Sequence, residues 1–339
     1  GRHAASNRRR AGQLNVNKQF AIAIGAGLVS GLLFVAAATG AVASLMVLVL
    51  LTPLPIAITG FCYGWAAAAI ASLVAAATLT VIGTINAGIF HLVLFGVPTT
   101  AAIYFALLCR DYTDEAGTTH REWYSIGRIL FGTAMASGLM ATAALFSLGT
   151  SSADLEAHVK TVIERMLSAD IPWPGGEKPT AEQMGDLAQL LTISFSAAIA
   201  LFWMWIVLFN LWVGAKIART SGLLPRPWPN VSMVELPPIT GILLAVSVAA
   251  SFLADYPGLI ASGFASGLFV AFTLAGLAII HNISWNNSLR PLILIVVYAF
   301  LLFFNPISGL AIASLALIEP LLPLRKPENG GYRPPRPPE

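Results

Sequence analysis

The side chains in this sequence that could do chemistry are few, and the most informative ones lie inside apolar segments. Asn210 lies close to Trp203 and Trp205, and Asn86 and His91 begin another apolar segment. Polar groups in hydrocarbon are costly and usually face a bundle interior or a cavity. An amide among aromatic rings is typical of an apolar pocket with one orienting polar group. We therefore expect these five residues to bind a small-molecule ligand.

The same residues have simpler interpretations that remain open. A central Asn210 is equally consistent with a hydrogen bond between helices. Trp203 and Trp205 are also consistent with packing, or with the aromatic belt at a membrane surface. These alternatives require no ligand.

No recognisable catalytic or metal-binding motif accompanies these residues. The sequence has no HExxH, GxSxG or P-loop pattern. Glu235, Asp255 and Glu319 lie at the ends of apolar segments, which favours interfacial roles over proton transfer. Cys62 and Cys109 form no CxxC pair. We expect no enzymatic activity, no catalytic or metal-ligating residue and no cofactor. A lipid-handling enzyme is the weakest alternative, because the sequence offers no nucleophile or acid–base pair.

The composition of the chain indicates the environment in which these side chains lie. Hydrophobic residues make up 57% and charged residues 10% of the chain, whereas soluble domains carry roughly 25% charged residues. Too few polar side chains remain to cover a water-soluble particle. The net charge of +3 does not indicate nucleic-acid binding, because the basic residues form no patch with interleaved aromatics. The lipid bilayer is therefore the expected surroundings.

Segments of sufficient length to cross the bilayer follow one another along the chain. A spanning helix needs about 20 mainly apolar residues. The predicted segments are 20–38, 41–61, 63–85, 87–109, 126–148, a segment within 187–216, 239–254, 259–281, 291–304 and 307–318. Asn305 and Pro306 separate the last two, which we interpret as a short hairpin or a broken span. The predicted fold is an all-α, polytopic transmembrane helix bundle with about 8–10 membrane segments.

Charge predicts how these segments are oriented. Arg2, Arg8–Arg10 and Lys18 place the N-terminus in the cytoplasm. The charged loop 110–124 then falls inside and the acidic insertion 149–186 outside. The hairpin reading also places Arg325 and Lys326 inside.

The insertion contains an amphipathic helix with one apolar face, formed by Leu155, Val159, Val162, Ile163, Met166 and Leu167. It is expected to lie at the membrane surface or cap the bundle, or else to act as a lid or docking helix.

Small residues at four-residue spacing mark two helix faces. Ala23, Gly27 and Gly31 lie on the first segment, and Gly263 and Gly267 on the eighth. Small residues let membrane helices approach closely. We expect these faces to be helix-docking surfaces, either within the chain or toward another subunit.

Several short motifs carry a family resemblance. They are residues 51–55 (LTPLP) with Gly64, 290–292 (RPL), 317–319 (LIE), and Arg325 with Lys326. Over about Phe20–Lys326 the chain resembles the YybS-like family of predicted membrane proteins. That family is distantly similar to the S components, the substrate-binding subunits of energy-coupling-factor transporters.

The resemblance implies a small-molecule-binding subunit. It also implies that a coupling membrane subunit and an ATPase reside on other chains. Ala23, Gly27 and Gly31 match the docking pattern of the first S-component helix, although this chain is longer than a typical S component and carries the insertion.

We therefore expect a transporter-type subunit in the bacterial cytoplasmic (inner) membrane, and the alternative is a structural or assembly subunit of a membrane complex. The expected regions are 1–18, a disordered basic N-terminus; 19–148, a first transmembrane half; 149–186, the external insertion; 187–322, a second transmembrane half; and 323–339, a Pro-rich disordered tail.

Overall fold

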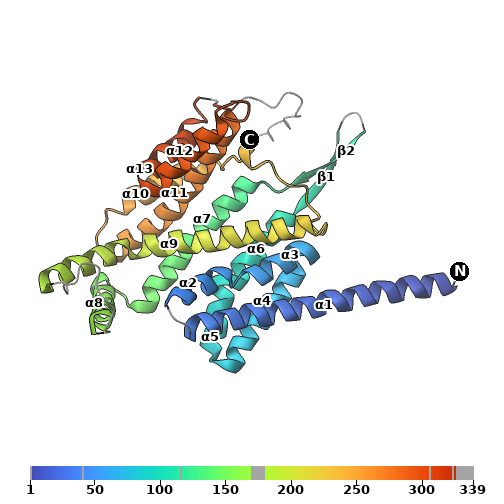
Figure 1. Ribbon diagram of the computed structural model, residues 1–339, viewed down its shortest axis with the longest axis horizontal. Coiled ribbons are helices and arrows are strands. Elements are labelled where there is room, and N and C mark those ends of the chain that lie inside the picture. The colour runs from blue at the N-terminus through green and yellow to red at the C-terminus, as the bar shows by residue number, and fades with distance from the viewer. Residues whose placement is uncertain are drawn as a thin grey trace.

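The structure is a computed structural model that describes residues 2–39, 42–114, 117–168, 180–304, 307–322 and 324–325. Asn305, Pro306 and residues 326–339 of the expected tail lie outside this part. Figure 1 shows the helices packed into a bundle crossed by one long helix, α9.

The elements follow in chain order. The helices are α1 Arg2–Thr39, α2 Val42–Leu51, α3 Leu54–Tyr63, α4 Trp65–Ile82, α5 Ile85–His91, the π-helix η1 Leu92–Gly96, α6 Val97–Leu107, α7 Ile126–Leu148, α8 Ser152–Ser168, α9 Ala181–Thr220, the 3-10 helix η2 Val231–Met233, α10 Ile239–Ala250, α11 Asp255–Ile283, α12 Arg290–Phe303 and α13 Ile307–Ile318. The strands are β1 Cys109–Thr113 and β2 Thr119–Trp123.

The helical membrane fold is confirmed. Within the described residues, six helices are long and apolar enough to cross a membrane. Four shorter apolar stretches accompany them: Val47–Tyr63, Ile239–Ala250, Arg290–Phe303 and Ile307–Ile318. Together they correspond to the ten segments predicted from the sequence. Large apolar side chains such as Val81 and Phe252, both 85% exposed, are then in contact with lipid.

The helices form two groups joined by α9. Helices α1, α3, α5 and α6 pack around α4, whereas α7, α10 and α13 pack around α11. The 40-residue α9 packs on α3 of one group and on α7 and α11 of the other. In Figure 1 it passes between the blue helices and the orange ones. Helix α7, which we assigned to the first half, therefore packs mainly with the second.

The N-terminal segment differs from expectation. Helix α1 begins at Arg2, within the segment that we expected to be disordered, and its first turns extend beyond the other helices in Figure 1. Residues 2–18 contain no proline, and Gly12 is the single glycine among them. Nothing in them therefore interrupts a helix that the apolar residues after Lys18 propagate.

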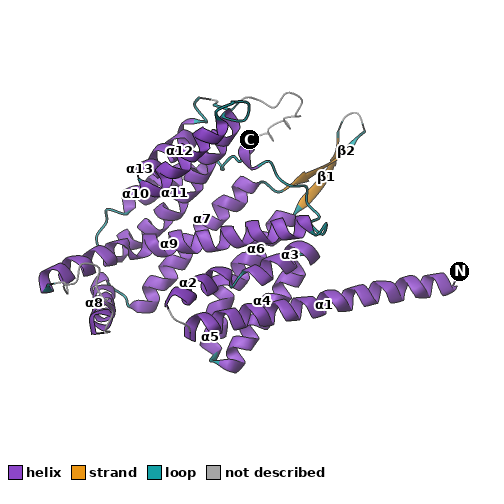
Figure 2. Ribbon diagram, in the orientation of Figure 1, coloured by secondary structure: helices purple, strands orange, loops and turns teal. Residues whose placement is uncertain are grey.

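The charged loop 110–124, which we expected as a connection between two spans, contains regular structure. It forms an antiparallel hairpin of β1 and β2, drawn in orange in Figure 2. Arg110 lies opposite Glu122 and Asp111 opposite Arg121, and both pairs form salt bridges. The Arg121 guanidinium holds the pKa of the Asp111 carboxyl below its ordinary value.

The amphipathic helix of the insertion is α8, and it packs against one end of the bundle. Leu155 is fully buried and Ile163 nearly so. Leu155 packs with Leu145, Tyr256 and Leu259. The backbone N–H of Ser152 donates to the Asp255 carboxylate at 2.6 Å. Asp255 itself has a left-handed backbone with φ of 60°. The helix therefore packs on α9 and on the end of α7, and Ser152 and Leu155 contact the start of α11.

Candidate functional site

Buried polar side chains of α9 donate to backbone carbonyls near the prolines that interrupt the membrane helices. Pro53 and Pro55 separate α2 from α3, because neither can donate to the preceding turn. Asn210 is fully buried on α9. Its Nδ2 donates to the Leu50 carbonyl and to the Ile206 carbonyl, both at 2.6 Å. Asn210 therefore makes the interhelical hydrogen bond that was the alternative to ligand binding.

His91 belongs to the same buried polar seam. The Ser30 hydroxyl donates to the Thr52 carbonyl at 2.7 Å, and His91 Nε2 lies 3.3 Å from that hydroxyl oxygen. A serine has one hydroxyl proton, so Nε2 must be the donor to Ser30. His91 Nδ1 and Asn210 Oδ1 are then buried acceptors with no donor within the described part of the chain. The rings of Phe34 and Phe95 pack against the imidazole.

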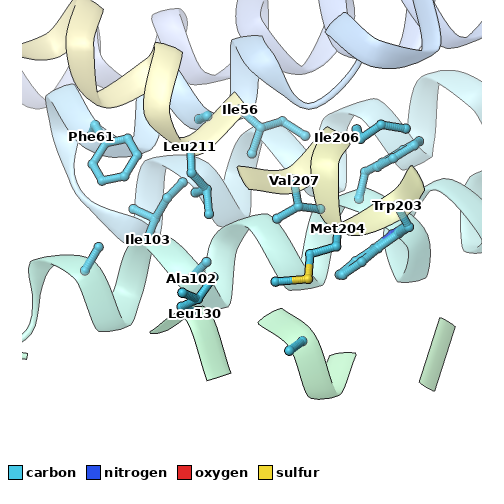
Figure 3. Packing of buried hydrophobic residues seen from close by; sticks show 14 of the residues in the cluster. Ile56, Phe61, Ala102, Ile103, Leu130, Trp203, Met204, Ile206, Val207 and Leu211 are labelled. Atoms are coloured by element: carbon cyan, nitrogen blue, oxygen red, sulfur yellow. The ribbon is translucent and has the colours of Figure 1, made fainter. Parts of the chain in front are cut away.

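Trp203 supplies a hydrogen bond that a proline removes from the backbone. Pro98 cannot donate to the Leu94 carbonyl one turn earlier, and this carbonyl lies in the π-helix η1. The indole Nε1 of Trp203 donates to it at 2.8 Å. Trp203 is 3% exposed. Figure 3 shows it beside Met204 on α9, in the same apolar cluster as Val207, Ala102 and Leu130. The hydrogen bond fixes the ring between α9 and the first helix group.

Trp203 also lies in the floor of a groove between α6, α7 and α9, with a volume of about 520 Å³. The groove therefore lies at the junction of the two helix groups, a location where ligand sites occur in helix bundles. Its lining is Pro98, Ala101, Ala102, Phe105, Tyr124, Arg128, Ile129, Phe131, Gly132, Thr133, Ala136, Trp203, Val207 and Pro237.

The groove has a buried floor and an exposed mouth. Ala102, Thr133 and Val207 are buried beneath it, whereas Ala101 and Gly132 are exposed at its rims on α6 and α7. A side chain added at Gly132 would meet no atom within 4 Å. Since α6 and α7 both lie in membrane-spanning segments, the mouth faces the lipid between them.

One end of the groove is closed by a connecting segment, residues 221–238, which we call the strap. Pro237 of the strap lines the groove. The Glu235 carbonyl lies against Gly127, where an added Cβ would be only 1.7 Å from that oxygen. Tyr124 and Arg128 lie at this same end, and the Arg128 guanidinium lies 5.8 Å from the Tyr124 ring centre.

Arginine side chains hold the strap in place. Arg226 Nη1 donates to the Ala106 carbonyl at the end of α6 at 2.9 Å, and burial lowers the pKa of this guanidinium. Arg325 donates to the Ser232 and Val234 carbonyls and forms an ion pair with Glu319. The strap is thereby tied to both helix groups.

The remaining predicted ligand-binding residues lie elsewhere. Trp205 is 48% exposed on the outside of α9, because two residues turn a helix by about 200° and place it opposite Trp203. Asn86 is exposed at the start of α5. Of the five predicted residues, only Trp203 lines the groove, while Asn210 and His91 form the buried seam.

The small-residue faces pack inside the chain. Added Cβ atoms at Gly27 and Gly31 would lie 2.4 and 3.1 Å from carbonyl oxygens of α4, and Ala23 is fully buried. Gly263 and Gly267 contact Ser196 of α9 and Ser137 of α7. These faces are therefore not free to dock another subunit, since helices of the same chain already cover them.

Sequence reasoning missed Arg128, Gly132 and Ala136 as site residues. The spacing of these three at i, i+4 and i+8 places them on one helix face, and this signal was readable. Among the described residues, no three His, Cys, Asp or Glu side chains could hold a metal ion.

Comparison with known proteins gives one match. Residues 28–319 match a family described as predicted membrane protein (DUF2232). The searches of curated proteins and of solved structures gave no match.

Proposed function

Because the chain belongs to the DUF2232 family of predicted membrane proteins, we propose that it is a multi-pass, transporter-type subunit that binds a small molecule in the groove between α6, α7 and α9. The observation that carries the proposal is the groove itself. Its volume of about 520 Å³ lies within the range of small-molecule sites, roughly 300–1,000 Å³. Ligand sites of this size are mostly apolar and carry a few well-placed polar groups. The groove fits this description, because its apolar walls include the fixed indole ring of Trp203 and the guanidinium of Arg128.

Two features of the fold support transport rather than catalysis. Helices interrupted inside the membrane, like α2–α3 and η1–α6, are typical of secondary transporters. The groove also contains no pair of acidic, histidine or nucleophilic side chains among its lining residues. The resemblance to S components adds that the energy source, an ATPase with a coupling membrane subunit, resides on other chains. The coupling contact cannot use the Gly27 face, which α4 covers.

The proposed location is the bacterial cytoplasmic membrane with the N-terminus in the cytoplasm. The strap end of the bundle carries Arg226 and Arg325, whereas α8 at the opposite end carries Asp154 and Glu156. An excess of Lys and Arg marks cytoplasmic loops, so the strap end faces the cytoplasm and α8 the outside.

The test compares two glycines whose surroundings are open. Gly132→Leu fills the groove mouth, and Gly25→Leu adds the same side chain on α1, where an added Cβ also meets nothing within 4 Å. Mass spectrometry of molecules released from the purified protein should find a compound in the wild type and in Gly25→Leu but not in Gly132→Leu. An identical set of compounds in all three proteins would contradict the proposed site.

A second candidate function is that of a structural or assembly subunit. The observation that favours it is the β1–β2 hairpin, which projects from the bundle in Figure 2 and whose residues are mostly exposed. Pulldown in mild detergent separates the two functions. Assembly would be favoured by two results together. Deletion of residues 110–122 would abolish binding of a stable partner protein, and no variant would release a small molecule.

A further inference from the structure

The shape of the groove restricts what can enter it. Its mouth lies between two spans, α6 and α7, so a molecule can reach it sideways from the bilayer. The exposed rim residues Ala101, Phe105 and Gly132 carry no charge, and the floor is apolar apart from the buried Thr133. A hydrocarbon chain fits these walls better than a polar solute. The Thr133 hydroxyl already donates to the Ile129 carbonyl at 2.9 Å, and the apolar side chains of the walls cannot replace lost water.

The length of the groove matches one leaflet of the bilayer. The lining runs along α7 from Arg128 to Ala136, eight residues or about 12 Å of helix. Along α6 it runs from Pro98 to Phe105, about 10 Å. Half of the hydrocarbon core is about 15 Å. A tail lying in the groove would therefore end near Trp203, with its head at the strap end.

The charge at the strap end determines the kind of head group. Arg128 lies in the first turn of α7 and is exposed. Among the described residues no carboxylate forms a salt bridge with it, and the acids of the adjacent hairpin, Asp111 and Glu122, are paired with Arg121 and Arg110. A guanidinium binds phosphate oxygens in bidentate fashion. An anionic group at this position can form an ion pair with Arg128, which lies at the depth of the lipid head groups.

We propose, on the basis of the function proposed above, that the groove binds an amphiphile with a hydrocarbon tail and an anionic, phosphate-type head. The tail lies between α6 and α7 on the Trp203 ring, and the head binds Arg128 beside Tyr124. The ligand enters from the leaflet at the strap end. Arg128 is the residue that selects the anionic head.

The experiment titrates the purified full-length protein in mild detergent and counts bound molecules by native mass spectrometry. The probes are phosphatidylglycerol, phosphatidylcholine with the same acyl chains, and inorganic phosphate. The variants are Arg128→Gln and Gly132→Leu. Their matched controls are Arg219→Gln, which removes an exposed charge at the strap end outside the groove, and Gly25→Leu.

The wild type and both controls should bind one phosphatidylglycerol roughly tenfold more tightly than phosphatidylcholine, a ratio equivalent to about 1.4 kcal/mol. Arg128→Gln should abolish this preference while tail binding remains, and Gly132→Leu should lose both lipids. Inorganic phosphate alone should not compete, because it lacks the tail.

Three outcomes would overturn the inference. If Arg128→Gln keeps the preference while Gly132→Leu still loses ligand, the head-group assignment is wrong but the proposed groove site stands. If inorganic phosphate competes at equal concentration, the ligand is a free anion and not a lipid. If Gly132→Leu binds both lipids as the wild type does, the groove is not the site, and the proposed function loses its support as well.

Discussion

Replacing Trp203 with Phe should destabilise the protein chiefly by leaving one carbonyl without a donor. The Trp203 indole is the donor to the Leu94 carbonyl at 2.8 Å. A buried polar group left unsatisfied costs about 1–3 kcal/mol, whereas hydrogen bonds between membrane helices average about 0.6 kcal/mol and reach about 1.7. We therefore expect a loss of about 1–2 kcal/mol in the free energy of unfolding.

The cause can be isolated with a double-mutant cycle. Pro98→Ala restores a backbone N–H one turn after Leu94, and this N–H can donate to the same carbonyl. In the Pro98→Ala background, Trp203→Phe should then cost about half as much, a coupling of about 0.5–1 kcal/mol. Trp205→Phe is the matched control, since Trp205 is 48% exposed on the outside of α9.

The assay is reversible unfolding in mixed detergent micelles, followed by circular dichroism. The four proteins of the cycle and the Trp205→Phe control are compared under the same lipid and detergent conditions. An equal cost of Trp203→Phe with and without Pro98 would refute the reasoning. The loss would then come from the smaller ring volume and not from the orphaned carbonyl.

Three further predictions concern packing, pH and charge. Gly27→Ala should cost about 1–3 kcal/mol in unfolding free energy through overpacking against α4, whereas Gly25→Ala, in open space, should cost nothing measurable. The backbone N–H of Thr150 holds the pKa of Asp154 below its ordinary value of 3.8. The stability that this carboxylate gives to α8 is thus present above pH 3.8 and is lost as the pH falls through the lower folded pKa. Hydrogen exchange of α8, corrected for intrinsic rates, should show this loss of stability. Asp154→Asn should remove this pH dependence. Arg325→Gln should leave the partly buried Glu319 and the strap carbonyls without their donor and cost about 1–3 kcal/mol. The strap should then become sensitive to limited proteolysis, and an unchanged cleavage rate would argue against this tie.

The membrane segments could be predicted because hydrocarbon imposes one strict rule. Every backbone group must find a partner inside its own segment, so length and apolar composition are sufficient to locate helices. The break at Pro53 follows from the same rule. The hairpin of β1 and β2 could not be read this way, because it lies outside the apolar segments. Its pairing of Arg110 with Glu122 becomes visible only once the two strands are in register.

The candidate site could be predicted only in part, for a geometric reason. Asn210 and Trp203 are seven residues apart, which places them on the same face of α9. Trp203 donates to the Leu94 carbonyl, which Pro98 leaves without its usual donor, and Asn210 donates to the Leu50 carbonyl near the break between α2 and α3. Trp205 was grouped with them by sequence distance alone. The other two walls of the groove come from α6 and α7, and their approach depends on how α9 sets the two helix groups apart, which no single segment encodes.

The tie between Arg325 and the strap also has a consequence for biosynthesis. Arg325 follows its acceptor Val234 by 91 residues, and translation adds roughly 5–20 residues per second. The strap therefore leaves the ribosome roughly 5–20 s before Arg325 is synthesised. During this time α10 to α13 are still being inserted. During that interval the strap is held through Arg226 and the Ala106 carbonyl of the first helix group, and its tie to the C-terminal helices forms last.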